Sequence, residues 1–231
     1  MRRIRIVVAY DGTNYCGWQI QPNGITIEEI LNRQISKLTG EDIRIIGASR
    51  TDSGVHALGN VAVFDTESRI PGDRFAYALN QKMPEDIVIV RSDEVQIDWH
   101  PRYQNEISKT YEYHIYNAKV RNPLKNRYST FVSFDLDVEK MRQGAKYILG
   151  EHDFASFCNV RTNAKDTVRT VHEITIKESQ LHRPHGHGSH NEAVSSSYVL
   201  LLRGSILPPS PWQGHLHGGT QIQKAVQGLE S

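Results

Sequence analysis

One pattern constrains the fold more than any other: segments of strand periodicity alternate with segments of helix periodicity, and the series runs twice. Residues 2–12 place apolar side chains at every second position and end in Asp-Gly, which predicts a strand and a turn. Residues 26–40 begin with a Thr-x-x-Glu capping pair and continue as an apolar helical stripe that stops at glycine. The same reasoning predicts further strands over 43–48, 60–65 and 86–92 and a helix over 73–81.

The second half of the chain repeats this alternation. It predicts a long strand over 107–117, a helix over 137–149 that ends at Gly150, and a strand over 171–177. We therefore expect an α+β protein with a boundary near 98–101. The expected parts are an N-terminal half over 1–100, an incomplete C-terminal half over 101–180, and a separate tail over 181–231.

The tail differs in composition from the rest of the chain. Its last fifty residues hold only five of the 53 charged side chains but six of the eleven histidines, seven glycines and four prolines. Tyr198–Leu202 could form one strand, and the prolines after it predict irregular structure. A run of four histidines between 182 and 190 could bind a metal, although adventitious binding is the commoner behaviour of such a run. We expect the tail to be poorly structured.

Composition excludes several classes of protein. A chain of 231 residues can bury a core without disulfides, and Cys16 and Cys158 are too few for a disulfide framework. No apolar run approaches the roughly 20 residues of a membrane span, and residues 1–8 show no secretory leader. We therefore expect a cytoplasmic protein without a membrane anchor. The net charge of +1 argues neither for nor against nucleic acid.

Two local clusters of positive charge are candidates for phosphate binding. The first is Arg2, Arg3 and Arg5. The second contains Lys119, Arg121, Lys125 and Arg127, within a stretch over 118–130 that has no acidic residue. For any such cluster taken alone, a solvated surface is the more frequent explanation.

The loop GASRTDSGVHA, residues 47–57, carries the strongest sign of chemistry. Its small residues leave room for a substrate to approach the backbone, and they flank Arg50, Asp52 and His56. A carboxylate there can act as nucleophile or base, and Arg50 would keep Asp52 ionised by lowering its pKa. A structural Arg50–Asp52 pair in a turn is an equally weighted alternative. A Ser53 nucleophile is disfavoured because no strand–elbow–helix context surrounds it.

A second candidate lies on the strand predicted over 107–117. Lys109, Tyr111 and Tyr113 alternate and therefore share one face. An aromatic ring and a cation on an open sheet surface could stack a base and pair its phosphate. The residues alone favour the alternative, in which these tyrosines are ordinary core or half-core positions.

Four ordered blocks resemble the bacterial tRNA pseudouridine synthase A family. They are YDGTNYCGWQIQPNGITIEEIL (10–31), GASRTDSGVHA (47–57), KTYEYHIYN (109–117) and GEHDFASFC (150–158). The resemblance implies an isomerase without a cofactor or metal that converts uridine to pseudouridine at positions 38, 39 and 40 of the tRNA anticodon arm. It also implies a homodimer, and two ferredoxin-like halves around a central antiparallel sheet that is flanked by helices and has a cleft between the halves.

The resemblance also assigns roles to single residues. Asp52 matches the catalytic nucleophile, Arg50 the arginine beside the flipped nucleotide, and Tyr111 the tyrosine that stacks on the target uracil. Asn60 stands where the family usually has Gln, and Ile20 where a basic residue is common.

After about residue 180 the family's Met-Val-Arg core and its covering helix have no counterpart. An out-of-frame C-terminus is our hypothesis for this departure, and sequencing of the gene tests it. The alternatives to an active enzyme are a catalytically impaired tRNA-binding homologue and a non-functional product.

Overall fold

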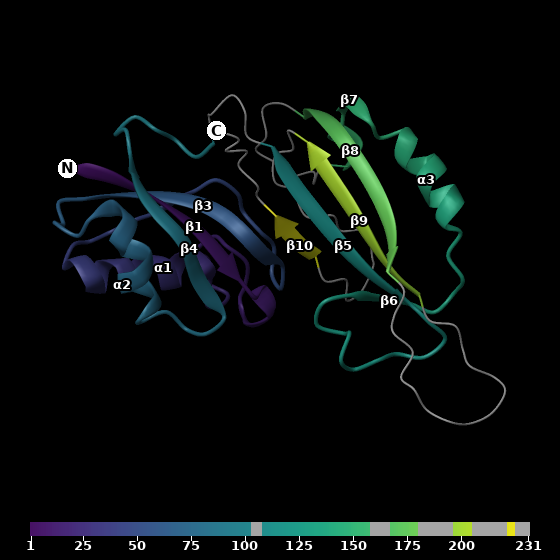
Figure 1. Cartoon of the computed structure of the whole chain (residues 1–231), viewed down its shortest axis with the longest axis horizontal. Helices are drawn as coiled ribbons and strands as arrows, with labels where there is room; N and C mark the ends of the chain where they lie inside the picture. The colour runs from purple at the N-terminus through teal and green to yellow at the C-terminus, as the bar shows by residue number, and fades with distance from the viewer. Residues whose placement is uncertain (103–107, 158–166, 180–195, 205–220, 225–231) are drawn as a thin grey trace. The chain divides into compact units, whose positions relative to one another are not determined.

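The computed structural model describes residues 1–102, 108–157, 167–179, 196–204 and 221–224, and the chain divides into two compact units (Figure 1). Unit 1 comprises Met1–Lys109 and Gln223–Ser231, and unit 2 comprises Thr110–Ile222. Unit 1 thus extends past the boundary expected near 98–101. Among the described residues, no helix is both long and apolar enough to span a bilayer.

Unit 1 is built on three antiparallel strands. Strand β1 (Arg2–Tyr10) lies between β3 (His56–Thr66) and β4 (Ile87–Val95), with Ile6 opposite both Ala62 and Ser92. The short β2 (Ile46–Gly47) pairs with β3. Alternate β1 side chains are completely buried while their neighbours are half-exposed, as the sequence predicted.

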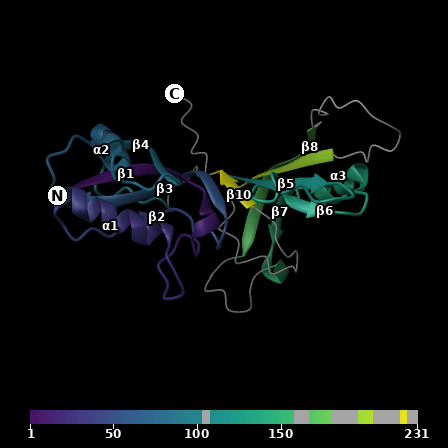
Figure 2. The ribbon, with the colours of Figure 1, turned by 90° about the horizontal axis from the view of Figure 1, so that it is seen from below.

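Two helices pack on the buried face of these strands, and Figure 2 shows α1 running alongside β1 and β3. They are α1 (Ile27–Thr39) and α2 (Phe75–Asn80), accompanied by 3-10 turns at Gly12–Asn14 and Gly72–Arg74. The Phe64 and Phe75 rings meet edge to face, with centroids 5.3 Å apart. The core cluster consists of Ile4, Ile6, Val8, Tyr10, Tyr15, Trp18, Ile27, Ile30, Leu31, Ile35, Ile43, Ile45, Ala57, Ala62, Phe64, Phe75, Leu79, Ile87 and Ile89.

Helix α1 begins and ends where the sequence predicted. The Thr26 hydroxyl accepts a hydrogen bond from the Glu29 amide at 3.3 Å, which supplies the N-cap. Gly40 adopts a left-handed conformation, with φ of 77°, and its amide donates to the Ser36 carbonyl. Both ends therefore follow from local chemistry.

Two of the predicted elements of unit 1 are shorter than expected. The strand predicted over 43–48 is reduced to Ile46–Gly47, because its first amides bond to α1 instead of to a strand. The Ile43 amide donates to Ser36 Oγ and the Ile45 amide to Asn32 Oδ1, both at 2.9 Å. The helix predicted over 73–81 begins as a 3-10 turn, and its α-helical part covers only Phe75–Asn80.

In unit 2 the strands are hydrogen-bonded in the order β5, β9, β8, β7. Its strands are β5 (Lys109–Asn117), β7 (Gly150–Asp153), β8 (Val168–Ser179) and β9 (Ser196–Gly204). Strand β6 (Thr130–Val132) pairs with β5 in parallel, so strand pairing is mixed where the resemblance implied an antiparallel sheet. Helix α3 (Val138–Lys146) lies beside β8 (Figure 1), a 3-10 turn follows at Ala155–Phe157, and β10 covers Gln221–Lys224. The α+β class is confirmed.

Strand β9 places one described part of the tail in the sheet of unit 2. It pairs antiparallel with β8, with Leu202 opposite Ile174 and Leu200 opposite Ile176. Tyr198 on this strand is buried. The strand suggested over Tyr198–Leu202 is thus confirmed and extended, because its apolar side chains match those of β8. The histidine run between 182 and 190 lies outside the described residues.

The two units differ in how much apolar surface they bury. None of the α3 residues is buried, and Phe134 and Tyr147 are 68% and 84% exposed. Among the described residues, the core cluster draws only on unit 1. Since burial of apolar area is the main stabilising contribution, unit 1 is expected to be the more stable unit.

Candidate active site

Asp52 lies in the loop that connects β2 to β3, and the backbone around it is fixed from several sides. The Thr51 carbonyl accepts from the Trp18 amide at 3.0 Å, and the Thr51 hydroxyl bonds to the Tyr10 hydroxyl at 2.9 Å. On the other side, the Gly54 amide donates to the Tyr15 carbonyl at 3.3 Å. The loop is therefore held in one conformation before any substrate arrives, as precise catalysis requires.

The Asp52 carboxyl has a displaced pKa. Its side chain reaches solvent, yet the surrounding protein removes part of its hydration, and this burial raises the pKa of Asp52 above its ordinary value. A carboxylate with a raised pKa is a stronger base than a fully hydrated one. Displaced pKa values of this kind are concentrated at functional sites.

Arg50 does not act on Asp52 as the sequence predicted. Its side chain is exposed, and within the described residues no ion pair joins it to Asp52. The shift of the Asp52 pKa is upward and has burial as its cause, whereas a neighbouring guanidinium would have lowered it. Both the expected lowering and the alternative of a structural Arg50–Asp52 pair are therefore wrong for the free protein.

His56, the third polar residue of the loop, is buried and supports a turn. Its Nδ1 lies 3.0 Å from Asp11 Oδ1. Asp11 also accepts a hydrogen bond from the Thr13 amide at 3.0 Å and caps the 3-10 turn Gly12–Asn14. Asn60 is buried nearby in sequence, on β3, and donates to the Ser49 carbonyl at 3.1 Å. These side chains hold the two ends of the loop.

The N-terminal arginines are engaged in ion pairs across the sheet. Arg3 contacts both oxygens of Asp65 at 2.7 Å, and Arg5 contacts Asp93 at 2.6 Å; each pair stands directly opposite on neighbouring strands. Arg2 pairs with Glu94 at 2.7 Å. A phosphate would have to compete with these carboxylates, so in the free protein the three arginines are engaged within the sheet and their binding of phosphate stays a prediction.

The model of the tRNA pseudouridine synthase family matches residues 6–104 and 145–196, which include the whole Asp52 loop. The chain belongs to this family. Proteins named tRNA pseudouridine synthase A are 49% identical over 177 residues in Acetivibrio thermocellus (77% of this chain, 72% of the relative) and 44% identical over 180 residues in Thermoanaerobacter sp. (78% and 73%). The Geotalea daltonii protein of that name is 40% identical over 232 residues, 98% of this chain and 94% of its own. The resemblance is thereby confirmed.

The comparison with Geotalea also bears on the end of the synthase chain. That alignment extends beyond residue 180, and β9 places residues 196–204 in the sheet of unit 2. Similarity to the family is therefore not confined to the part before the tail. The hypothesis of an altered reading frame stays a prediction.

Tyr111 of the synthase lies on β5, and its ring is 6% exposed, while Tyr113 is half-buried. Lys109, on the same face of the strand, is also 6% exposed. The face is therefore not the open platform that the sequence suggested, and in the free protein Tyr111 is buried.

The stretch 118–130 of the synthase connects β5 to β6 and remains a candidate for phosphate binding. Lys119 forms an exposed ion pair with Asp135 at 2.8 Å, and the Arg121 guanidinium lies 4.9 Å from the centre of the Phe131 ring. Arg127 is exposed and Lys125 is half-buried. Exposed pairs of this kind contribute at most about 1 kcal/mol, so a phosphate competes with them easily.

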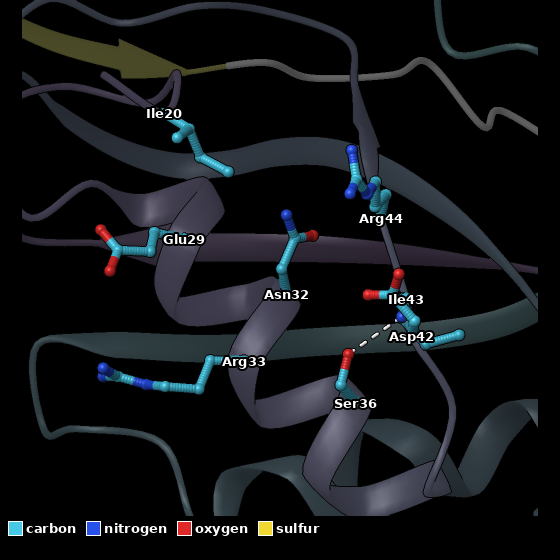
Figure 3. A pocket seen from close by; sticks show the side chains of 8 residues that line it. All are labelled: Ile20, Glu29, Asn32, Arg33, Ser36, Asp42, Ile43 and Arg44. Carbon is cyan, nitrogen blue, oxygen red and sulfur yellow. Dashed lines mark hydrogen bonds between the residues drawn. The ribbon is translucent and has the colours of Figure 1, made fainter. Parts of the chain in front are cut away.

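A hollow of about 440 Å³ lies beside α1 of the synthase and does not include the Asp52 loop (Figure 3). Two acidic and two basic side chains line it, and its Asn32 and Ser36 side chains are bonded to the backbone of the adjoining segment. These two side chains therefore serve the packing of that segment on the helix. The lining residues are Ile20, Glu29, Asn32, Arg33, Ser36, Asp42, Ile43 and Arg44.

Reasoning from the sequence missed the residues that support the Asp52 loop. They belong to the segment 10–18, which includes Tyr10, Tyr15 and Trp18. This segment was recognised as a family block, and its two glycines at 12 and 17 were the available signal of close backbone approach. Nothing local shows that its partner is the loop more than thirty residues away.

Proposed function

We propose that this synthase converts uridine to pseudouridine at positions 38, 39 and 40 of the tRNA anticodon arm, with Asp52 as the nucleophile. The observation that carries the proposal is the Asp52 carboxyl, which is exposed, raised in pKa and held on a fixed backbone inside the region that matches the family. We infer the reaction from membership of the family. We infer the positions in tRNA from the resemblance described above.

The reaction is an isomerisation, so atoms and electrons balance within the nucleotide. The bond between N1 of the base and C1′ of the ribose breaks, and a bond between C5 and C1′ forms. The proton lost from C5 is balanced by the proton gained at N1. Asp52 either attacks C1′ as the N1–C1′ bond breaks and leaves again when C5 bonds to C1′, or removes a proton from the ribose and returns it after the base has turned. Its partial desolvation favours either role.

Substrate binding assigns roles to two further residues. The target nucleotide must leave its stack before C1′ can be reached, and a flipped base needs an aromatic partner. We assign stacking to Tyr111, as the resemblance implies; this ring is buried in the free protein and would have to be uncovered when tRNA binds. We assign contact with the flipped nucleotide to Arg50, whose guanidinium is exposed. As the resemblance implies, the synthase works in the cytoplasm as a homodimer, without a cofactor or a metal.

The direct test uses anticodon-arm transcripts that carry C5-tritiated uridine at a single position. Tritium release is expected from uridine at 38, 39 or 40, and none is expected from uridine elsewhere in the loop. Binding without release would identify the alternative, a catalytically impaired tRNA-binding homologue. Release from a different position would overturn the assigned specificity.

Salt dependence tests the proposed contact of the stretch 118–130 with phosphates. Neutralising Lys119, Arg121, Lys125 and Arg127 together should weaken tRNA binding and reduce the slope of log K against log salt by about 0.7–0.9 per lost contact, because fewer counterions are released. A matched control removes four exposed cations of unit 1, namely Lys37, Arg69, Arg74 and Lys82. Equal slopes in the two variants would make the stretch ordinary surface.

A further inference from the structure

Gly17 lies directly against the backbone that carries Asp52. Its φ of 82° is in the left-handed region, which side chains other than glycine rarely adopt. A Cβ added at Gly17 would lie 2.5 Å from the Thr51 carbonyl oxygen, 3.1 Å from the Asp52 carbonyl carbon and 3.3 Å from the Ser53 amide nitrogen. These are backbone atoms, so they cannot turn away as the end of a side chain can.

The segment that contains Gly17 is itself held by the start of α1. The Ile27 amide donates to the Gly17 carbonyl at 3.1 Å, and the Glu28 amide donates to the Trp18 carbonyl at 3.0 Å. These are amides of the first helical turn, which have no acceptor within the helix. The Trp18 amide then donates to the Thr51 carbonyl. A continuous chain of hydrogen bonds thus runs from the helix to the residue before Asp52.

The other side of Asp52 is tied to the same segment. Ser53 Oγ donates to the Tyr15 carbonyl at 3.2 Å, and the Gly54 amide donates to the same oxygen at 3.3 Å. The backbone of the loop therefore lies directly against the backbone of residues 15–18. The absence of a side chain at Gly17 allows this short distance between them.

We propose that Gly17 is a positioning residue for the isomerisation, which sets where Asp52 meets the nucleotide by allowing the 51–53 backbone to lie against residues 15–18. The inference rests on the proposed role of Asp52. A methyl group at position 17 pushes this backbone outward, and a misplacement of about 1 Å can cost about 10²-fold in rate. Binding of tRNA, which is spread over many phosphates, is little affected.

The chain offers a matched control for the backbone strain of Gly17→Ala. Gly40 has a φ of 77°, and a Cβ added there meets nothing within 4 Å. Gly40→Ala therefore introduces the same left-handed strain without the contact with the Asp52 loop. Multiple-turnover kcat, tRNA Kd and Tm are compared for both variants. We expect kcat to fall about 100-fold in Gly17→Ala and less than about 2-fold in Gly40→Ala, with Kd within a few-fold in both.

The expected split between kcat and Kd distinguishes positioning from a loss of folded protein. Equal kcat values in the two glycine variants would overturn the proposal. Should Gly17→Ala not fold, Ser53→Ala decides: it removes only the bond to the Tyr15 carbonyl, and a fall in kcat of about 2–10-fold without loss of Tm supports the proposal. An unchanged rate in Ser53→Ala then overturns it.

A parallel measurement on Asp52→Asn distinguishes failure of the positioning role of Gly17 from failure of the proposed role of Asp52. If that variant is inactive while Gly17→Ala equals Gly40→Ala, only the positioning role fails and the proposed function stands. If Asp52→Asn retains full turnover, the nucleophile assignment and the positioning role fail together.

Discussion

Replacing Asp52 by Asn is expected to lower turnover by about 10²–10⁴-fold while leaving tRNA affinity within a few-fold. The amide has the shape of the carboxyl group but cannot serve as nucleophile or base at neutral pH. Tritium release in single-turnover experiments measures the rate, and filter binding measures the affinity. Asp42→Asn is the matched control, because Asp42 is an exposed aspartate of the same unit that lies outside the loop. Turnover preserved in Asp52→Asn would contradict the assignment.

The same substitution should have a pH-dependent effect on stability. Burial raises the pKa of Asp52 in the folded protein, so the protonated form is favoured there. The stability that this group contributes is present below the pKa of the unfolded chain and is lost as pH rises through the folded pKa. At pH 7 the Asn variant should therefore have a slightly higher Tm than the wild type. At a pH below both pKa values this difference in Tm should vanish. An equal difference in Tm at both pH values would contradict the upward shift of the Asp52 pKa.

Turnover of the wild type should follow the ionisation of the same carboxyl. Because the ionised form is required, the rate should rise with pH through the folded pKa of Asp52, which lies above that of an ordinary aspartate. A rate that is already at its plateau below the ordinary aspartate pKa would argue against this group.

Truncating the core of unit 1 should strongly destabilise the protein. Phe75 is completely buried against Phe64, and Phe75→Ala should lower the free energy of unfolding by about 3–5 kcal/mol, from lost burial and the cavity left behind. Urea unfolding followed by far-UV circular dichroism measures the change. The same truncation in unit 2, Phe131→Ala, should cost less than half as much, because Phe131 is only half-buried.

The expected difference between the two phenylalanine variants can be contradicted directly. Equal losses for Phe75→Ala and Phe131→Ala would show that unit 2 depends on its packing as strongly as unit 1 does. A transition in two steps, with only the second affected by Phe75→Ala, would show that the units unfold separately.

The elements that the sequence predicted well are those whose signals are local. Helix α1 is bounded by its own capping residues, Thr26 and Gly40, and β1 by an alternation that matches burial on one face. The segment 43–45 was misjudged because its apolar alternation is real, yet its amides bond to side chains of α1. Periodicity shows which side chains are buried and leaves open which partner accepts each amide.

For the candidate site as well, the sequence predicts features that depend on neighbouring residues and misses contacts between residues far apart in the chain. The loop 47–57 and its carboxylate were evident from residue types alone. The partners of Arg3 and Arg5 were not, because Asp65 and Asp93 lie 62 and 88 positions away and meet them only through strand register. The environment of Asp52 was misjudged for a related reason: closeness of Arg50 in sequence does not place its guanidinium on the carboxyl group.

The position of the core cluster along the chain has a consequence for biosynthesis. All its residues lie between Ile4 and Ile89, so they leave the ribosome before the strands of unit 2 do. Domains generally fold as units during synthesis, from the N-terminus onward. The packing around the Asp52 loop can therefore form while the remainder of the chain is still being translated, and the nascent protein would carry its reactive carboxylate on an ordered scaffold before the C-terminal strands emerge.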